Sequence, residues 1–240
     1  MSDIEDDLRH RLARVHRILT AGGIWPLTKG HVSARVPGAK QILVLSHIHA
    51  RGRTLDTTTP DDICTVGYDG TQLAGTIDPV GELYMHTAIL SQRSDLHSVV
   101  HCHSTYATAL GVAGVKILPV GRRGAPFYPQ VPILDFDGQI DSAAKGQRLV
   151  DVLSDGCAVV LKNHGTVVAA DTIENATMLA FALEDTARLQ YLASGVGTPQ
   201  GMSEAEARST MSGHRRDEYF NHVWQHYAVM DPRPGDPPPR

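Results

Sequence analysis

The sequence is poor in cysteine, has no excess of positive charge and lacks a long apolar run. Its three cysteines, Cys64, Cys102 and Cys157, are far apart and form no Cys-x-x-Cys pair, which gives no disulfide framework and suits a reducing compartment. The formal net charge of −4 argues against nucleic acid or an anionic membrane as partner, since either needs a clustered basic face. No run approaches the roughly 20 apolar residues of a membrane span, and the acidic start MSDIEDDLRH lacks the apolar segment of a secretory signal. We therefore expect a cytoplasmic protein that binds neither nucleic acid nor membrane.

What the chain does have is the pattern of one α/β domain over residues 1–230. Hydrophobic residues make up 42% of the 240 residues, enough for a sizeable core. Helical periodicity predicts helices over 3–19, 79–92, 105–110, 142–153, 172–193, 204–211 and 215–227. Extended patterns predict strands over 31–36, 41–45, 63–66, 96–103, 157–161 and 166–170. We expect helices around a mostly antiparallel sheet, followed by a disordered tail at 231–240, DPRPGDPPPR, which is half proline.

The nearest approach to a basic cluster lies in the first predicted helix. Arg11, Arg14 and Arg17 recur there at helical spacing, on one side of the helix. We interpret them as a solvated face, because three arginines alone do not make a nucleic-acid surface.

Two histidines end the predicted strand 96–103. His101 and His103 are two residues apart, so in a strand both side chains point to one face and can share a metal ion. The same spacing recurs at His47-Ile48-His49, so the pattern alone also fits surface or core histidines. The position of the first pair at the end of a buried strand favours it.

A third imidazole can reach the same place. His164 follows the apolar run 157–161 in a tight turn and can return to the same edge of the sheet. Three histidines from neighbouring strands would leave room on an ion for substrate or water.

Glu82 offers a carboxylate at the start of the helix 79–92. An acid in a first helical turn is stabilised by the helix dipole, which is the alternative reason for its presence. Glu82 and His86 are four residues apart, as are His222 and His226. Either pair could hold a metal on one helix face, although packed or solvated histidines explain both as well.

The order of four motifs resembles the class II aldolase/adducin family, of the fuculose-phosphate aldolase type. The motifs are Gly30-His31-Val32-Ser33-Ala34-Arg35, Gly81-Glu82, His101-Cys102-His103 and Asn163-His164-Gly165. The resemblance runs from the first helix to about Tyr227. It implies a three-layer α/β/α domain with a mostly antiparallel central sheet, and homotetramers with active sites at subunit interfaces.

The resemblance also implies one divalent metal ion per subunit, which could be Zn, Mn, Fe or Co. Its ligands would be His101, His103 and His164, with Glu82 as ligand or proton shuttle. Such a metal acts as an electron sink that stabilises the enolate left when a carbon–carbon bond breaks.

The departures from the family argue against a phosphorylated sugar. The phosphate aldolases have Asn in the first motif, where this chain has His31, and small hydroxyl residues before the glutamate, where it has Val80 and Gly81. The segment 46–52 is a poor match to their phosphate-binding turn. This form looks more like a divergent branch that includes decarboxylases of hydroxylated aromatic or pyridine dicarboxylic acids.

A carboxylic acid substrate would also suit a pair of arginines. Arg123, or Arg122, falls near the position at which the aldolases bring a tyrosine to a neighbouring subunit's site, and a guanidinium binds both carboxylate oxygens. A surface arginine pair is the alternative. By the same resemblance, Ser33 would bind substrate, and His31 or Glu82 would supply the proton.

Four functions are compatible with these residues and with what the resemblance implies. The first is a metal-dependent lyase that decarboxylates a hydroxylated aromatic acid, such as a dihydroxyphthalate-like compound, through a metal-bound enolate. The second is an aldolase or epimerase acting on a non-phosphorylated hydroxy-keto acid or sugar. The third is a non-haem iron oxygenase that uses the same ligands. The fourth is an adducin-like binding module without catalysis, against which the intact histidines and glutamate argue.

Overall fold

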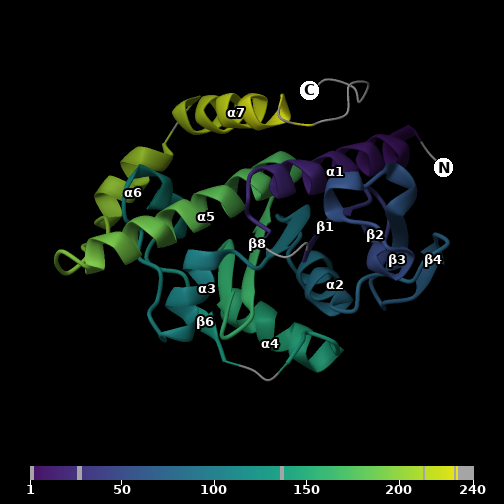
Figure 1. The fold of residues 1–240 in the computed structure, drawn as a ribbon, viewed down its shortest axis with the longest axis horizontal. Helices are drawn as coiled ribbons and strands as arrows, with labels where there is room; N and C mark the ends of the chain where they lie inside the picture. Colours follow the sequence, from purple (N-terminus) through teal and green to yellow (C-terminus); the bar gives the residue numbers. More distant parts are fainter. Residues whose placement is uncertain (1–2, 26–28, 136–137, 213, 230, 232–240) are drawn as a thin grey trace.

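A twisted sheet forms the centre of the molecule (Figure 1). The computed structural model describes residues 3–25, 29–135, 138–212, 214–229 and 231. Within these residues the sheet has eight strands in the order β4-β3-β2-β1-β5-β8-β7-β6. The strands are β1 (Gly30–Arg35), β2 (Gln41–Leu45), β3 (Ile63–Gly67), β4 (Gln72–Ala74), β5 (Ser98–Cys102), β6 (Ile133–Leu134), β7 (Ala158–Leu161) and β8 (Gly165–Ala170). Only β6 and β7 pair in parallel, so the prediction of a mostly antiparallel sheet is confirmed.

Helices cover both faces of this sheet. They are α1 (Asp3–Ala21), α2 (Leu83–Gln92), α3 (Thr105–Val112), α4 (Ala143–Leu153), α5 (Ile173–Ser194), α6 (Glu204–Met211) and α7 (His214–Ala228). Helices α1 and α5 pack on one face, α2 and α4 on the other, and α7 lies outside α5. Strands β5, β7 and β8 are buried along their whole length, and each contacts two of these helices. The α/β class and its layers are those expected from the resemblance.

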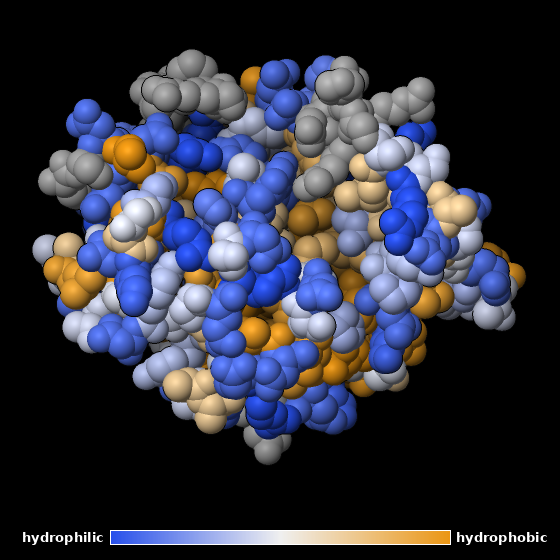
Figure 2. Space-filling model, turned by 180° about the vertical axis from the view of Figure 1, so that it is seen from behind, coloured by the Kyte–Doolittle hydropathy of each residue, from blue (hydrophilic) through white to orange (hydrophobic). Residues whose placement is uncertain are grey.

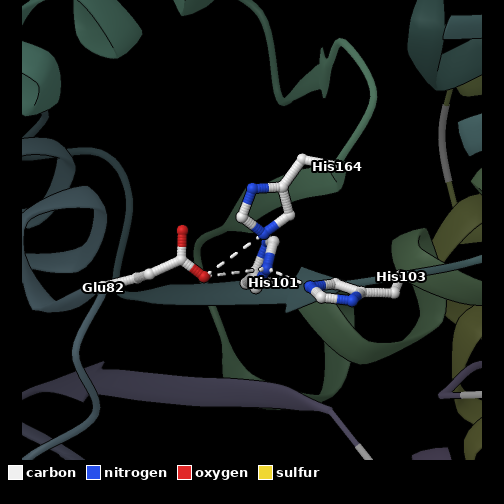
Figure 3. A group of neighbouring side chains, drawn as sticks. All are labelled: Glu82, His101, His103 and His164. Atoms are coloured by element: carbon white, nitrogen blue, oxygen red, sulfur yellow. Dashed lines mark hydrogen bonds and ion pairs between the residues drawn. The ribbon is translucent and has the colours of Figure 1, made fainter. Parts of the chain in front are cut away.

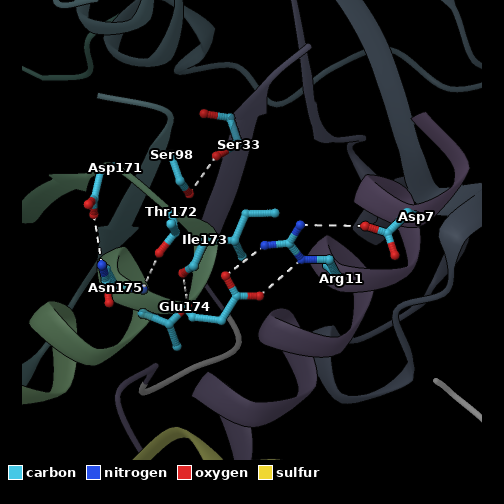
Figure 4. Close-up of polar contacts among 10 residues, drawn as sticks. Asp7, Arg11, Ser33, Ser98, Asp171, Thr172, Ile173, Glu174 and Asn175 are labelled. Atoms are coloured by element: carbon cyan, nitrogen blue, oxygen red, sulfur yellow. Dashed lines mark hydrogen bonds and ion pairs between the residues drawn. The ribbon is translucent and has the colours of Figure 1, made fainter. Parts of the chain in front are cut away.

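Hydroxyl side chains cap the N-termini of helices α4 and α5. Ser142 caps α4, and Thr172 caps α5 by accepting the N–H of Asn175 (Figure 4). The sequence patterns did not predict β4 or three 3-10 turns at Ile48–Arg51, Leu55–Thr57 and Pro60–Asp62. These segments are too short to show a periodicity.

The arginines of α1 do not form a solvated face, and that interpretation is wrong. The Arg17 side chain is 1% exposed and pairs with Asp231, whose carboxylate lies 2.7 Å from it. Arg14 lies 3.5 Å from the same carboxylate, and Arg11 binds Glu174 at the start of α5 (Figure 4). Asp231 and Glu174 therefore cover this side of α1.

Asp231 was expected to open the disordered tail, yet its carboxylate is 2% exposed in this ion pair. Residues 232–240, the remainder of the predicted tail, lie outside the described residues.

Hydrophilic residues predominate on the face opposite to that of Figure 1, and hydrophobic residues lie between them, partly in a hollow (Figure 2). Among the described residues, no helix combines the length and the apolar character needed to cross a membrane.

Candidate metal centre

Four side chains converge at one end of the central strands (Figure 3). Glu82, His101, His103 and His164 each offer a ligand atom, and these atoms lie within 4.8 Å of one another. The Nε2 atoms of His101 and His103 are 2.9 Å apart, and Glu82 Oε2 lies 3.5 Å from His101 Nε2 and 3.3 Å from His164 Nε2. Ligands about 2.1 Å from a tetrahedral ion are about 3.4 Å from one another. The spacing therefore fits a divalent cation at the centre.

The antiparallel pairing of β5 with β8 brings the three histidines together. His101 lies on β5, and His103 follows one residue after the strand ends at Cys102, so the alternation of side chains holds through both. Cys102 pairs with Thr166, which places the β7–β8 turn and its His164 beside His103.

Gly165 permits this close approach. A Cβ at Gly165 would lie 2.2 Å from the carbonyl oxygen of Cys102 and 3.0 Å from the His103 ring. The first residue of β8, directly after His164, must therefore be glycine if the strands are to pair here.

Carbonyl groups orient two of the imidazoles. His101 Nδ1 donates to the carbonyl of Thr166 at 3.0 Å, and His164 Nδ1 donates to that of Gly138 at 3.1 Å. Each Nδ1–H bond turns the Nε2 atom of its ring toward the centre. Glu82, the N-cap residue of α2, accepts the N–H of Ile140 at Oε1 and keeps Oε2 for the cluster.

The electrostatics keep Glu82, His101 and His103 deprotonated near neutral pH, as metal ligands must be, but favour the protonated form of His164. Burial alone would raise the pKa of Glu82, but the hydrogen bond from His164 and the charges of His101 and His164 outweigh it and lower the pKa to about 2. Burial lowers the pKa of His103 to about 4 and that of His101 well below its usual value. Burial also opposes protonation of His164, but its hydrogen bond with Glu82 outweighs this and raises its pKa.

A fourth imidazole stands beside the cluster. His31 lies opposite His101 in the β1–β5 register, and its Nε2 is 3.9 Å from Glu82 Oε2. Its Nδ1 is 2.7 Å from Nε2 of His86, and Nδ1 of His86 is 2.7 Å from the hydroxyl of Ser33. Ser33 is fully buried and faces His86, so it lies behind the site and does not line the cavity.

An open cavity of about 170 Å³ leads to the cluster. Val80 and Gly81 line it beside Glu82, so the wall before the glutamate offers no hydroxyl group. Lys29, His47 and His49 also line it, which the sequence patterns did not predict. The second His-x-His pair thus borders the same cavity but contributes nothing to the cluster.

The remaining predicted residues lie elsewhere. Arg122 and Arg123 begin a short 3-10 helix, Arg122–Phe127, and are exposed. Arg123 binds Asp185 at 2.9 Å, and neither arginine lines this chain's cavity. His222 and His226 are exposed on α7, away from the metal cluster. The sequence analysis paired His86 with Glu82 by their helical spacing, but His86 lies outside the cluster and instead contacts His31, which the sequence did not predict.

Comparison with known proteins agrees with the fold. Residues 10–191 match the family model of the class II aldolase and adducin N-terminal domain. The 3,4-dihydroxyphthalate decarboxylase of Arthrobacter keyseri is 29% identical over 208 residues, 79% of each chain. The 5-deoxy-D-ribulose 1-phosphate aldolase of Bacillus thuringiensis serovar kurstaki is 26% identical over 198 residues, 82% of this chain and 91% of that one. A solved L-fuculose 1-phosphate aldolase shares the fold, with a TM-score of 0.79 at 20% identity over 91% of this chain and 98% of that one. The chain described here belongs to the class II aldolase and adducin family.

Proposed function

We propose that the protein is a cytoplasmic, divalent-metal-dependent lyase that decarboxylates a hydroxylated aromatic carboxylic acid, such as a dihydroxyphthalate-like compound. One observation favours this function over the alternatives. The Nε2 atom of His31, a group that can hold a proton, faces the cluster 3.9 Å from Glu82 Oε2. The phosphate aldolases have an amide there, whereas decarboxylation requires a proton at a carbon atom.

The donor set fits the expected metal. Three imidazole Nε2 atoms and one carboxylate oxygen suit Zn²⁺, Mn²⁺, Fe²⁺ or Co²⁺, and two of the imidazoles are oriented for coordination by carbonyl groups. A cation bound there would withdraw electrons from a substrate oxygen and so stabilise the negative charge that develops as CO2 departs.

The residues of the chain account for the rest of the reaction. When the bond between the ring carbon and the carboxylate breaks, the electron pair stays on the ring carbon and CO2 leaves. That carbon then gains one proton. His31 Nε2 would supply it, or Glu82 Oε2, which is ionised near neutral pH and would first have to take a proton up. A proton taken up from the solvent then replaces the one delivered, so that the net reaction consumes one proton and releases CO2.

The cavity suits an anionic substrate. Lys29, His47 and His49 line its mouth, and Val80 and Gly81 give no hydroxyl for a phosphate. The relative from Arthrobacter keyseri acts on 3,4-dihydroxyphthalate, an aromatic dicarboxylate. In a homotetramer, Arg123 or Arg122 would bind a carboxylate at a neighbouring subunit's site, which is also part of the proposal.

A second candidate is an aldolase acting on a non-phosphorylated hydroxy-keto acid or sugar. The relative from Bacillus thuringiensis, an aldolase, supports this candidate, at an identity close to that of the decarboxylase.

A CO2-release assay tests the choice. The metal-reconstituted protein is mixed with a panel of ortho-hydroxylated aromatic mono- and dicarboxylates, with and without EDTA. We expect CO2 release that EDTA abolishes and that His103→Ala loses. If bound metal is confirmed and no acid releases CO2, the decarboxylase proposal is wrong. Release of pyruvate or glycolaldehyde from a hydroxy-keto acid or sugar would then favour the aldolase, and Fe²⁺-dependent oxygen consumption an oxygenase.

A further inference from the structure

Four imidazoles meet at the site, but only three belong to the metal cluster. His31 Nε2 is 3.9 Å from Glu82 Oε2, and its ring centroid is 4.9 Å from that of His101. A neutral imidazole with a free Nε2 lone pair at this distance would compete for the ion. Something must decide which nitrogen of His31 carries its proton.

A buried chain of hydrogen bonds runs from His31 into the core. Its Nδ1 meets His86 Nε2 at 2.7 Å, and His86 Nδ1 meets the Ser33 hydroxyl at 2.7 Å. Both His86 and Ser33 are completely buried. Each bond needs one proton, so the tautomers of the two histidines are coupled and the chain has only two directions while both rings are neutral.

The groups at the two ends of this hydrogen-bond chain favour the same one of the two directions. At the outer end the Glu82 carboxylate faces His31 Nε2 and favours a proton there. At the inner end a buried hydroxyl is better satisfied when it donates its hydrogen, and the bond to His86 Nδ1 is the hydrogen bond that the Ser33 hydroxyl makes. With Ser33 donating, His86 donates from Nε2 to His31 Nδ1, and His31 keeps its proton on Nε2.

We propose that His86, anchored by Ser33, fixes His31 in the Nε2–H tautomer, so that His31 serves the site as a hydrogen-bond donor to the substrate and not as a fourth metal ligand. His86 and Ser33 are positioning residues, since neither lines the cavity. A neutral imidazole N–H aimed at a substrate oxygen stabilises negative charge that develops on it. The catalytic part of this inference rests on the proposed function, whereas the tautomer does not.

The tautomer can be measured without substrate or metal. In the metal-free protein with 15N-labelled histidine, long-range 15N–1H correlations at neutral pH tell which ring nitrogen carries the proton, and loss of one signal set in His31→Gln assigns His31. We expect a proton on Nε2 of both His31 and His86. A proton on Nδ1 of His31 would overturn the proposal.

Variants separate positioning from packing. His86→Leu should convert His31 to a mixture of tautomers, whereas His86→Gln should restore Nε2–H, because an amide can donate to His31 and accept from Ser33. If His86→Leu does not fold, Ser33→Ala provides the test. Its matched control is Ser98→Ala. This variant removes a buried hydroxyl that donates to the Ser33 carbonyl at 2.8 Å but takes no part in the hydrogen bonds between Ser33, His86 and His31 (Figure 4). We expect a shifted tautomer population in Ser33→Ala and none in Ser98→Ala; equal spectra in these two variants would contradict the proposal.

Kinetics then test the link to catalysis. With an acid that releases CO2, Ser33→Ala should lower kcat several-fold with KM within about twofold, and His86→Gln should restore more activity than His86→Leu. If the tautomers behave as expected and no acid is decarboxylated, the proposed function fails and the hydrogen-bond chain stands. If CO2 is released but the tautomer is unchanged in the variants, the positioning role fails and the function stands.

Discussion

Two His-x-His pairs border one cavity in this protein, and only one of them belongs to the cluster that could hold a metal ion. His101 and His103 come from a buried strand and its end, and join His164 and Glu82 within 4.8 Å. His47 and His49 follow β2, and His49 belongs to the 3-10 turn Ile48–Arg51, in which residues two apart do not share a face. The same sequence spacing therefore gives two different geometries.

The two pairs do not differ in whether a backbone carbonyl orients one of their rings. His49 Nδ1 donates to the carbonyl of Arg53 at 2.9 Å, much as His101 Nδ1 donates to that of Thr166 at 3.0 Å. What the first pair has in addition is its neighbours, a third imidazole from the β7–β8 turn and a carboxylate from the start of α2. The difference teaches that a metal centre depends on the strands and helices that surround the motif.

The largest effect is expected from removing one ligand. His103→Ala should lower metal affinity by at least about 100-fold, because it deletes a donor from a preformed set, whereas His49→Ala should keep the metal. Elemental analysis of the two purified variants, followed by Zn²⁺ titration, measures this. Equal metal content in both variants would mean that the cluster is not the metal site.

A smaller loss of metal affinity is expected from displacing His164, the third imidazole of the cluster. In Gly165→Ala the new methyl group would meet the Cys102 carbonyl oxygen at 2.2 Å, so the β7–β8 turn must move and take His164 with it. We expect metal affinity to fall by about 10- to 100-fold. Gly197→Ala is the control, since a methyl group there meets nothing within 4 Å. Unchanged Zn²⁺ binding in Gly165→Ala would show that His164 is dispensable.

The site could be predicted from sequence as far as its residues lie in strands and recognisable motifs. Alternation along a strand places His101 and His103 on one face, and the motif order adds His164 and Glu82. The partners of these residues could not be predicted in the same way. His31 on β1 and His86 on α2 are 55 residues apart in the sequence. The periodicity of a single strand or helix cannot predict a contact between two such elements.

The same limit explains the arginines of α1. Helical spacing tells which residues share a face, but not what covers that face. Arg17 is buried by Asp231, which lies 214 residues further along the chain. Ser33 is a related case, because its motif predicts a functional neighbourhood and only the packing shows that it faces His86 and not the cavity.

The pH dependence of metal binding sharpens the contrast between buried and ordinary imidazoles. Protons compete with the metal, so affinity falls as pH falls. Glu82 and His103, with pKa values of about 2 and about 4, are already deprotonated at pH 5, whereas His164, whose pKa is raised above 6.5, must lose a proton. Between pH 5 and 6.5, affinity should therefore change about tenfold per pH unit, the slope for one proton. Zn²⁺ competition titrations measure this slope. A slope near three, as three ordinary histidines would give, would contradict the lowered pKa values of His101 and His103.

The smallest effect is expected at the mouth of the cavity, where groups act on the substrate and not on the metal. Lys29 is exposed and lines the cavity with His47 and His49, so its ammonium group attracts an anionic substrate through water. Lys29→Met should raise KM for an aromatic acid by about two- to fivefold, leave kcat and metal content unchanged, and lose its effect at high salt, where surface charges are screened. Lys116→Met removes an exposed lysine that does not line the cavity, and steady-state kinetics at two ionic strengths compare the two variants. Equal KM values for both variants would mean that the charge of the substrate does not lie near Lys29. A loss of metal in Lys29→Met would mean that the mouth of the cavity and the metal cluster do not act separately.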